Sequence, residues 1–172
     1  IIPALDEEAS IAGAIRSCRE AGPCEVIVVD GGSRDRTVEI ARGRADAVIA
    51  APPGRATQMN AGAVVARGGV LLFLHADTLL PGGSVPAVLG ALHDPAVIGG
   101  AFRVRLAASP GASRYVRATL GVTGRMIGAR AYVARAFTGD QAIFVRAEAF
   151  RAVGGYPEIP LMEDVELSRR MR

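Results

Sequence analysis

Two carboxylates and an imidazole stand where apolar runs of the sequence end. The run VIVV stops at Asp30, and the run LLFL stops at His75, with Asp77 two residues further on. Side chains of these types accept hydrogen bonds, bind metal ions and move protons. A single Asp after a strand most often caps a helix or forms a turn. Asp30 and Asp77 together favour a binding site instead, because each follows an unbroken apolar run.

The elements around these residues follow the pattern of an α/β domain. Apolar runs alternate with helical patterns, which is typical of a mainly parallel sheet. Helices are predicted over the stripe of Ile11, Ile15 and Cys18, after Ser33 as an N-cap, and over residues 57–66. The predicted strands cover residues 1–3, 25–29, 47–50, 70–74, 97–106 and 141–145.

A parallel sheet places the ends of its strands at one edge. In an open α/β sheet, ligands bind beyond the carboxyl ends of the strands. Asp6, Asp30 and Asp77 follow the first, second and fourth predicted strands. The sequence therefore predicts a rim of carboxylates at that edge. Taken alone, Asp6 or Asp35 is better explained as a cap or turn residue.

Composition narrows the classes of protein that remain. The chain has 172 residues, half of them hydrophobic, which suits a single domain with its own core over 1–172. The net charge is only +3 and Trp is absent, so nucleic-acid binding is not expected. Cys18 and Cys24 lack metal-type spacing and are too few for a disulfide framework, which favours the reducing cytoplasm. No apolar run reaches the ~18 residues of a membrane helix. Because the chain begins without Met and stops inside a predicted helix, both ends are expected to be clipped.

Four motifs occur in order along the chain: IIPALDEEASI, VIVVDGGSRDRTVEIA, LLFLHADTLLP and GGYPEIPLMEDVELSRR. Together they resemble the signatures of family 2 glycosyltransferases with the Rossmann-like GT-A fold, in particular a bacterial subgroup with PGRATQMNAGA and a His-Ala-Asp triplet. The resemblance implies transfer of a sugar from a UDP-type or GDP-type donor, with inversion and a divalent metal. It also implies helices on both faces of the sheet, a nucleotide-sugar-binding half over 1–94 and an acceptor-side half over 95–172.

On the donor side, the resemblance implies that Asp30 accepts a hydrogen bond from the base or ribose of the nucleotide. Pro3 and Glu8 are then expected in the other wall of that pocket. Arg55 follows a rigid Pro-Pro-Gly turn, and its planar guanidinium suits phosphate oxygens. The alternative for Arg55 is a surface position beside a helix start. For Gln58 and Asn60 in the same motif, a structural role is expected.

The resemblance assigns the metal to Asp77. A divalent cation held by few carboxylates neutralises a leaving diphosphate well. The family's triplet usually begins with an acidic residue, whereas this chain has His75. Three roles are open to His75: a contact with the ribose or a phosphate, coordination of the metal, or a structural hydrogen bond at a strand end. Mn²⁺ and Mg²⁺ are both candidates, and Mn²⁺ tolerates an imidazole better.

On the acceptor side, the resemblance assigns Asp164 as the base that takes the proton of the acceptor hydroxyl, with Glu163 positioning the acceptor. Without the other motifs, paired acids at a helix start would be interpreted as partners of the helix dipole. Asp140 is a second candidate for substrate contact. Gly154 and Tyr156 are expected in a flexible acceptor-side loop.

The stretch from residue 95 to 139 contains seven arginines and no acidic residue. Interpreted as a helix from Ser113, residues 113–130 have an arginine face and an apolar face. Such an element suits an anionic membrane surface or a phosphorylated or lipid-linked acceptor. An ordinary amphipathic helix packed on the sheet is the more frequent explanation. The protein is therefore expected in the cytoplasm, with peripheral contact at the inner face of the membrane as a further hypothesis.

Two other functions stay open beside the transferase. A nucleotidyltransferase shares a similar nucleotide-binding half, but it generally needs a Gly-rich basic loop after the first strand, where this chain has the acidic PALDEE. A noncatalytic module that binds a sugar nucleotide is suggested by His75 and by the short acceptor region. A Rossmann oxidoreductase is disfavoured because the full Gly-x-Gly-x-x-Gly fingerprint is missing. A haloacid-type phosphatase is excluded because its Asp nucleophile should stand at His75.

Overall fold

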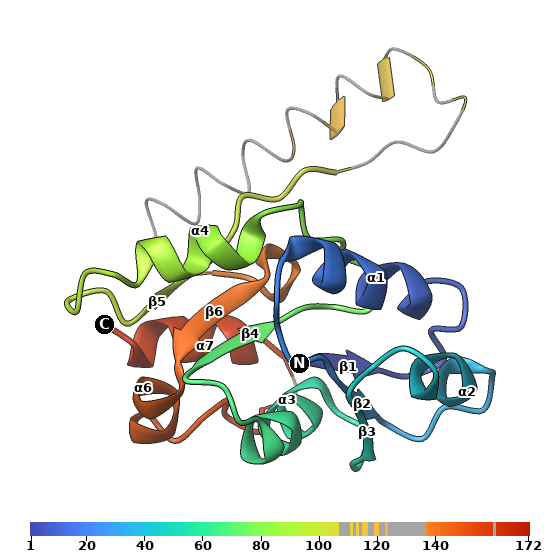
Figure 1. Ribbon diagram of the computed structural model, residues 1–172, viewed down its shortest axis with the longest axis horizontal. Coiled ribbons are helices and arrows are strands. Elements are labelled where there is room, and N and C mark those ends of the chain that lie inside the picture. Colours follow the sequence, from blue (N-terminus) through green and yellow to red (C-terminus); the bar gives the residue numbers. More distant parts are fainter. Residues whose placement is uncertain are drawn as a thin grey trace.

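The computed structural model describes residues 1–106, 111, 113, 115, 116, 119, 120, 123, 137–159 and 161–172. Figure 1 shows that strands and helices alternate along its N-terminal part. The strands are β1 (Ile2–Ala4), β2 (Ile27–Asp30), β3 (Ala47–Ala50), β4 (Val70–Phe73), β5 (Gly99–Gly100) and β6 (Ile143–Arg146). The helices are α1 (Ile11–Ala21), α2 (Thr37–Arg42), α3 (Arg55–Val65), α4 (Ser84–Ala91), α6 (Ala147–Ala152) and α7 (Glu163–Arg170), and a 3-10 turn covers Gly139–Gln141.

Two three-stranded sheets meet at the N-terminus of the chain. Strands β1, β2 and β3 are parallel, while β6 lies between β4 and β5 and runs antiparallel to both. The Ile1 amino nitrogen donates to the Leu72 carbonyl at 2.8 Å, and the Leu74 amide donates to the Ile1 carbonyl at 3.0 Å. This is the bonding pattern of a parallel pair, so β4 continues the sheet beside β1. The carboxyl ends of β1, β2 and β4 therefore share one edge.

Helices cover both faces of the sheet because side chains alternate along each strand. On one face, α1 packs on Ile2 and Val28, and α4 packs on Phe144. On the other face, α3, α6 and α7 pack on Phe73 and Val145. Figure 1 shows the same two layers of helices on either side of the strands. The predicted α/β fold with helices on both faces is confirmed.

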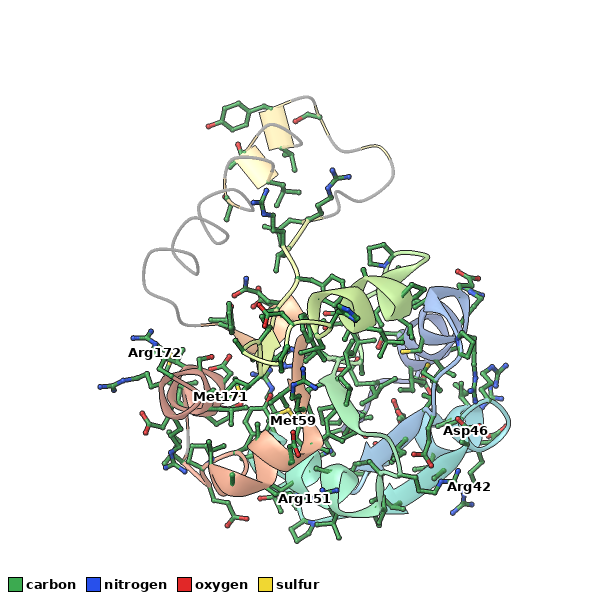
Figure 2. All side chains as sticks on the ribbon, turned by 60° about the vertical axis from the view of Figure 1, so that its left-hand side comes forward. Arg42, Asp46, Met59, Arg151, Met171 and Arg172 are labelled. Atoms are coloured by element: carbon green, nitrogen blue, oxygen red, sulfur yellow. The ribbon has the colours of Figure 1, made fainter. Side chains whose placement is uncertain are left out.

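Spacing along α3 explains which side of that helix is buried. Ala56, Met59 and Ala63 lie three or four residues apart, so they share the face that packs on the sheet. Met59 is only 2% exposed and lies in the interior, whereas Arg42 and Arg151 lie at the outside of the molecule (Figure 2). The sequence places the start of this helix at residue 57, two residues later than the structure does.

The predicted strand over 97–106 is wrong for most of its length. Only Gly99–Gly100 forms a strand, paired with Val145 and Phe144 of β6. Phe102 adds one further backbone bond, from its amide to the Gln141 carbonyl at 2.7 Å. The pairing ends there because Gly139–Gln141 folds into a 3-10 turn, which also removes Gln141 from the strand predicted over 141–145.

The prediction of Ser33 as an N-cap is also wrong. Helix α2 begins at Thr37, and the Ser33 hydroxyl instead donates to the Asp30 carboxylate. The Asp35 carboxylate accepts a bond from the Thr37 amide at 2.9 Å. Asp35, and not Ser33, therefore accepts a backbone amide at the start of α2. Residues 31–36 form a loop at the edge of the sheet.

Most of the arginine-rich element predicted over 113–130 lies outside the described residues. Within the described part, Tyr115, Val116, Thr119 and Leu120 are helical, and the Val116 amide donates to the Ser113 hydroxyl at 3.3 Å. This bond is the one expected of an N-cap at Ser113. Among the described residues, no helix is long and apolar enough to cross a membrane.

Candidate functional site

The loops after β1 and β2 are joined by reciprocal hydrogen bonds. The Asp6 amide donates to the Ser33 hydroxyl at 3.0 Å, and the Arg34 amide donates to the Asp6 carboxylate at 2.6 Å. Asp6 has a φ of 56°, a left-handed conformation that Asp tolerates better than most residues. The two loops therefore form one unit at the carboxyl edge of the sheet.

Glu8 extends this unit. Its amide donates to the Asp35 carboxylate at 2.9 Å, and its own carboxylate accepts the Arg36 amide at 3.1 Å. The Glu8 side chain remains exposed at the surface of the loop, whereas Pro3 is buried within β1 opposite Val29. The two residues predicted for one wall of a nucleotide pocket thus lie in neighbouring parts of the same edge.

Asp30 is the last residue of β2 and is only 8% exposed. Its carboxylate accepts bonds from the Gly32 amide at 3.0 Å and from the Ser33 amide at 3.1 Å. The Ser33 hydroxyl donates to it as well. Asp30 therefore holds the loop that follows it, and only the lone pairs left over from these bonds are available to a ligand.

Gln58 binds the strand ends that lead into the same loops. Its side-chain nitrogen donates to the carbonyls of Ala4 at 2.9 Å and Val29 at 2.8 Å, at the ends of β1 and β2. Asn60 exchanges two bonds of 2.9 Å with the backbone of Tyr156. The structural roles expected for both amides are confirmed, and the partners, which no sequence pattern indicated, are now known.

His75 and Asp77 follow β4 at the shared edge. The His75 ring is half-buried, while Asp77 is exposed and accepts a bond from the Thr78 hydroxyl at 3.2 Å. Burial lowers the pKa of His75, and the nearby charge of Arg55 lowers it further. The carboxylates of Asp77, Asp140 and Asp164 oppose this shift. The imidazole is therefore largely neutral at pH 7 and keeps a lone pair for bonding.

Asp164 lies in the first turn of α7, next to the buried Glu163. One carboxylate oxygen accepts the amide of Gly139, and the other accepts the amide of Val165 at 2.7 Å. Met162, which precedes the helix, has a left-handed φ of 69° that is unusual for such a side chain. Two backbone bonds thus set the direction of the carboxylate.

The structure brings His75 and Asp164 together at Gly139. A Cβ atom added to Gly139 would overlap the His75 imidazole, and the same point lies 3.6 Å from Asp164 Oδ2. His75 and Gly139, which are 64 positions apart in sequence, thus meet at one turn. The sequence places Gly139 on the acceptor side, but nothing in its neighbourhood indicates that His75 packs on it.

Arg55 and Asp140 lie around this cluster. Arg55 is exposed at the start of α3, and within the described residues it forms no ion pair. Asp140 is half-buried in the 3-10 turn next to Gly139. Both charges act on His75, so both lie within electrostatic reach of the end of β4.

Gly154 and Tyr156 lie in the segment between α6 and α7. Gly154 has a left-handed φ of 81° in the turn after α6. The Tyr156 ring is 2% exposed and packs on Phe73 and Phe150, with ring centroids 4.9 and 5.7 Å apart. Burial raises the pKa of Tyr156, and the neighbouring carboxylates of Asp164 and Glu163 raise it further, so the phenol keeps its proton. The segment is anchored in the core at Tyr156.

The chemistry of the donor set fits a divalent cation that has other ligands of its own. No group of three or more His, Cys, Asp and Glu side chains converges to hold a metal within the described residues. Asp77 offers an exposed carboxylate, with a neutral imidazole beside it at His75. Mg²⁺ and similar cations are commonly bound by one or two carboxylates together with substrate phosphates.

Comparison with known proteins adds a family and a set of structures. The family described as "Glycosyl transferase family 2" matches residues 1–146. None of the curated proteins is similar enough to the chain to match it. Among solved structures, the mannosyltransferase PcManGT from Pyrobaculum calidifontis, in complex with GDP-Man and Mn²⁺, is similar with a TM-score of 0.74 and 20% identity over 99% of this chain and 50% of that one.

Two further structures share the fold. Residues 1–349 of TarS from S. aureus give a TM-score of 0.73 and 17% identity over 99% of this chain and 53% of that one. Glucosyl-3-phosphoglycerate synthase from Mycobacterium tuberculosis, in complex with UDP, has a TM-score of 0.60 and 21% identity over 87% of this chain and 56% of that one. The chain thus spans about half of each of these solved chains, and 32% of the longer TarS structure.

Proposed function

The chain belongs to glycosyl transferase family 2, and from this premise we propose that it moves a sugar from a nucleotide diphosphate donor to an acceptor hydroxyl. The observation that supports this most is the cluster at Gly139, which holds the Asp164 carboxylate beside the end of β4. An inverting transferase needs a base on the acceptor side of the anomeric carbon and a binding site for the leaving diphosphate on the opposite side. Asp164 at the start of α7 would supply the first, and the end of β4 would supply the second.

Asp164 is proposed to take the proton of the acceptor hydroxyl as that oxygen attacks the anomeric carbon. Attack from the side opposite the departing diphosphate inverts the configuration at that carbon. Glu163 precedes Asp164 in the helix and is proposed to position the acceptor. Asp140 and Gly154 complete the proposed acceptor side, and the buried Tyr156 is proposed to hold this segment in place from the core.

The donor is proposed to lie along the carboxyl edge of the sheet. Pro3, Glu8 and Asp30 are assigned to the nucleoside, and Arg55 to the phosphates. PcManGT is in complex with GDP-Man, and TarS has been solved with UDP and with UDP-GlcNAc, so UDP-type and GDP-type donors are both proposed.

Asp77 would hold a divalent cation, Mn²⁺ or Mg²⁺, together with the donor phosphates. Such a cation, when bound, supplies positive charge that offsets the charge on the leaving diphosphate. PcManGT and the mycobacterial synthase were both solved with Mn²⁺. His75 lies beside Asp77, so its imidazole is proposed to lie near the ribose, phosphates or metal without being required for their binding.

The acceptor is proposed to be lipid-linked or phosphorylated. This rests on the arginine-rich stretch 113–130, of which only Ser113, Tyr115, Val116, Thr119, Leu120 and Thr123 are described. Tyr115 is 81% exposed, as a side chain available to a partner would be. We also propose that the protein contacts the inner face of the cytoplasmic membrane peripherally and acts there.

Replacement of Asp164 by Asn tests the function. We expect release of nucleotide from UDP-glucose or GDP-mannose with Mn²⁺ to fall by about 100-fold or more, because Asn cannot take the proton. Calorimetric affinity for the nucleotide should stay unchanged. Glu148→Gln, an acidic side chain in the first turn of α6, is the control. Full activity of Asp164→Asn would contradict the assignment of the base, and nucleotide binding without turnover in the wild type would favour a noncatalytic module.

A further inference from the structure

His75 touches the turn that holds the proposed base. Its imidazole occupies the space where a side chain on Gly139 would begin. Gly139 is not in the left-handed region of φ, so its backbone conformation is open to alanine. Space alone, and not conformation, therefore requires glycine at this position.

Gly139 in turn orients Asp164, because its amide donates to one of the two carboxylate oxygens. The turn is tied to α7 at a second point as well. The Phe137 amide donates to the Ser168 hydroxyl at 3.0 Å, and that hydroxyl donates to the Asp164 carbonyl at 2.8 Å. A shift of the turn would therefore move the carboxylate relative to a bound acceptor.

The remaining side of the turn is fixed by Gln141, which is 3% exposed. Its side-chain oxygen accepts the Thr138 amide at 3.0 Å, and its side-chain nitrogen donates to the Phe102 carbonyl at 3.2 Å. Anchors to α7 and to the Phe102 segment thus hold the turn on two sides. The imidazole of His75 closes it on the side that faces the end of β4.

We propose that His75 is a positioning residue for Asp164: it packs on Gly139, fixes the turn, and so keeps the Gly139 amide aimed at the carboxylate. The inference rests on the proposed function, since it takes Asp164 as the base. It gives His75 a role that needs no bond from the imidazole to donor or metal. In this role, a residue on the donor side of the site, His75, helps to hold the base on the acceptor side, Asp164, in place.

Enlarging residue 139 and shortening residue 75, singly and together, tests the contact. Gly139→Ala should lower nucleotide release from UDP-glucose or GDP-mannose by about 100-fold, because the new methyl displaces the turn. His75→Ala leaves a gap and should lower it by about 10-fold. The double variant has room for the methyl, so it should turn over at least about 10-fold faster than Gly139→Ala alone. If the loss of rate in the double variant equals the product of the losses in the two single variants, the proposal is overturned.

Binding and hydrogen exchange separate positioning from ligation. In His75→Ala, calorimetric affinity for UDP or GDP with Mn²⁺ should stay within about 2-fold of the wild type, whereas the Gly139 amide should exchange with solvent at least about 10-fold faster. His93→Ala, the other histidine and an exposed one, is the control and should change neither quantity. Loss of metal-dependent nucleotide binding in His75→Ala, or unchanged exchange at Gly139, would overturn the proposal.

Different results would contradict the proposed function and the role of His75. If wild type and Asp164→Asn release nucleotide equally slowly from both donors, the proposed function is wrong. In that case the exchange rate of the Gly139 amide still reports whether His75 fixes the turn, because it requires no turnover. If Asp164→Asn is inactive and the His75→Ala substitution does not restore activity to Gly139→Ala, the proposed function stands and the role given to His75 is wrong.

Discussion

Acidic side chains at the carboxyl edge of the sheet differ in how much of their hydrogen-bonding capacity is already used. Asp30 accepts bonds from two amides and a hydroxyl of its own loop. Asp164 has one amide on each carboxylate oxygen. Asp77 accepts a single hydroxyl and is exposed. Of these three, the carboxylate with most free capacity is the one assigned to the cation, while those assigned to the nucleoside and to the base are held by backbone amides.

The two cysteines differ in reactivity for a reason visible at the same scale. Burial raises the pKa of the Cys18 thiol to about 11, whereas Cys24 is exposed. Because the thiolate is the nucleophile, iodoacetamide at pH 8 should label Cys24 at least about 10-fold faster than Cys18 in the folded protein. Peptide mapping by mass spectrometry measures both rates. Equal labelling would show that Cys18 is not buried as described.

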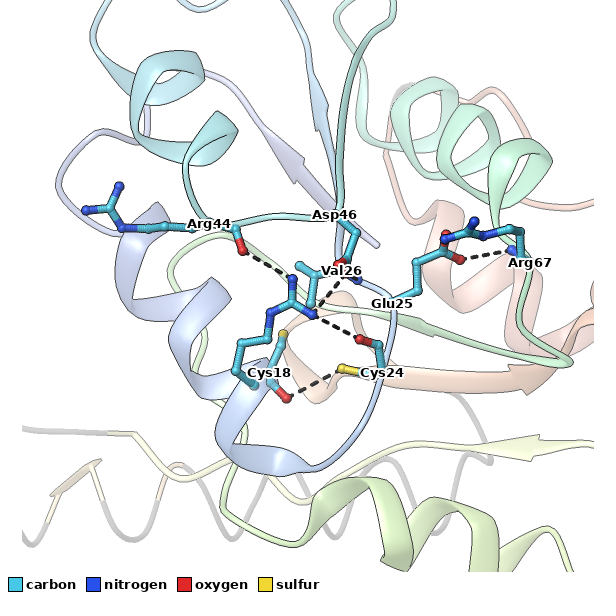
Figure 3. Close-up of polar contacts among 8 residues, drawn as sticks. Cys18, Cys24, Glu25, Val26, Arg44, Asp46 and Arg67 are labelled. Carbon is cyan, nitrogen blue, oxygen red and sulfur yellow. Dashed lines mark hydrogen bonds and ion pairs between the residues drawn. The ribbon is translucent and has the colours of Figure 1, made fainter.

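At the scale of elements, Arg19 of α1 joins three segments on the side away from the site. Its guanidinium donates to the carbonyls of Cys24 at 3.1 Å and Arg44 at 3.2 Å, and it pairs with the Asp46 carboxylate at 2.9 Å (Figure 3). The same carboxylate accepts the Val26 amide at 2.6 Å. The start of β2 and the loop before β3 are thereby tied to the end of α1.

Arg19→Ala should lower the free energy of unfolding by about 1 kcal/mol, a modest value because the pair is partly exposed. The bond to Arg19 lowers the pKa of Asp46 below its usual 3.8, so this contribution is complete above that pH and is lost below it, as the pH falls through the lowered pKa of the folded protein. Urea unfolding at pH 7 and pH 3 measures it. Arg16→Ala, which breaks an exposed pair of 4.0 Å, is the control and should change little. An equal difference at both pH values would contradict the role of Asp46.

Close packing of α3 on the sheet gives a second prediction at this scale. A Cβ on Gly62 would press on Ile1 and would lie 3.0 Å from Val29 Cγ2. Gly62→Ala should therefore destabilise the protein by about 2 kcal/mol in urea unfolding. A Cβ added to Gly90 in α4 would meet no atom outside its own helix turn within 4 Å, so Gly90→Ala should be neutral or stabilising by about 0.5 kcal/mol. If both substitutions behave alike, the packing of α3 is not as tight as described.

For the whole molecule, the fold was predictable because its signal is repeated along the chain. Apolar runs such as the one that ends at Asp30 mark buried strands, and the helical stripe from Ile11 marks α1. Prediction failed where tertiary partners decide the outcome. The strand expected over 97–106 is cut short because its partner β6 begins only at Ile143. Ser33 does not cap α2 because Asp30 binds its hydroxyl.

The candidate site divides in the same way. Carboxylates at strand ends and at a helix start could be selected from the sequence, since local pattern sets their place in the elements. The contact of His75 with Gly139, and the bonds of Gln58 to Ala4 and Val29, depend on segments far apart in the chain. No local pattern records such contacts, so the support of the site could be described only from the structure.

The central claim is that the edge formed by β1, β2 and β4 binds a nucleotide diphosphate through a cation at Asp77. Calorimetric titration of UDP and GDP with Mn²⁺, with Mg²⁺ and with chelator tests this most directly. We expect one nucleotide to bind only with metal, and Asp77→Asn to weaken that binding at least about 10-fold, because the cation loses its carboxylate. Asp94→Asn, which changes an exposed aspartate in the loop after α4, should bind as the wild type does. Binding that is unchanged by chelator, or unchanged in Asp77→Asn, would contradict the account.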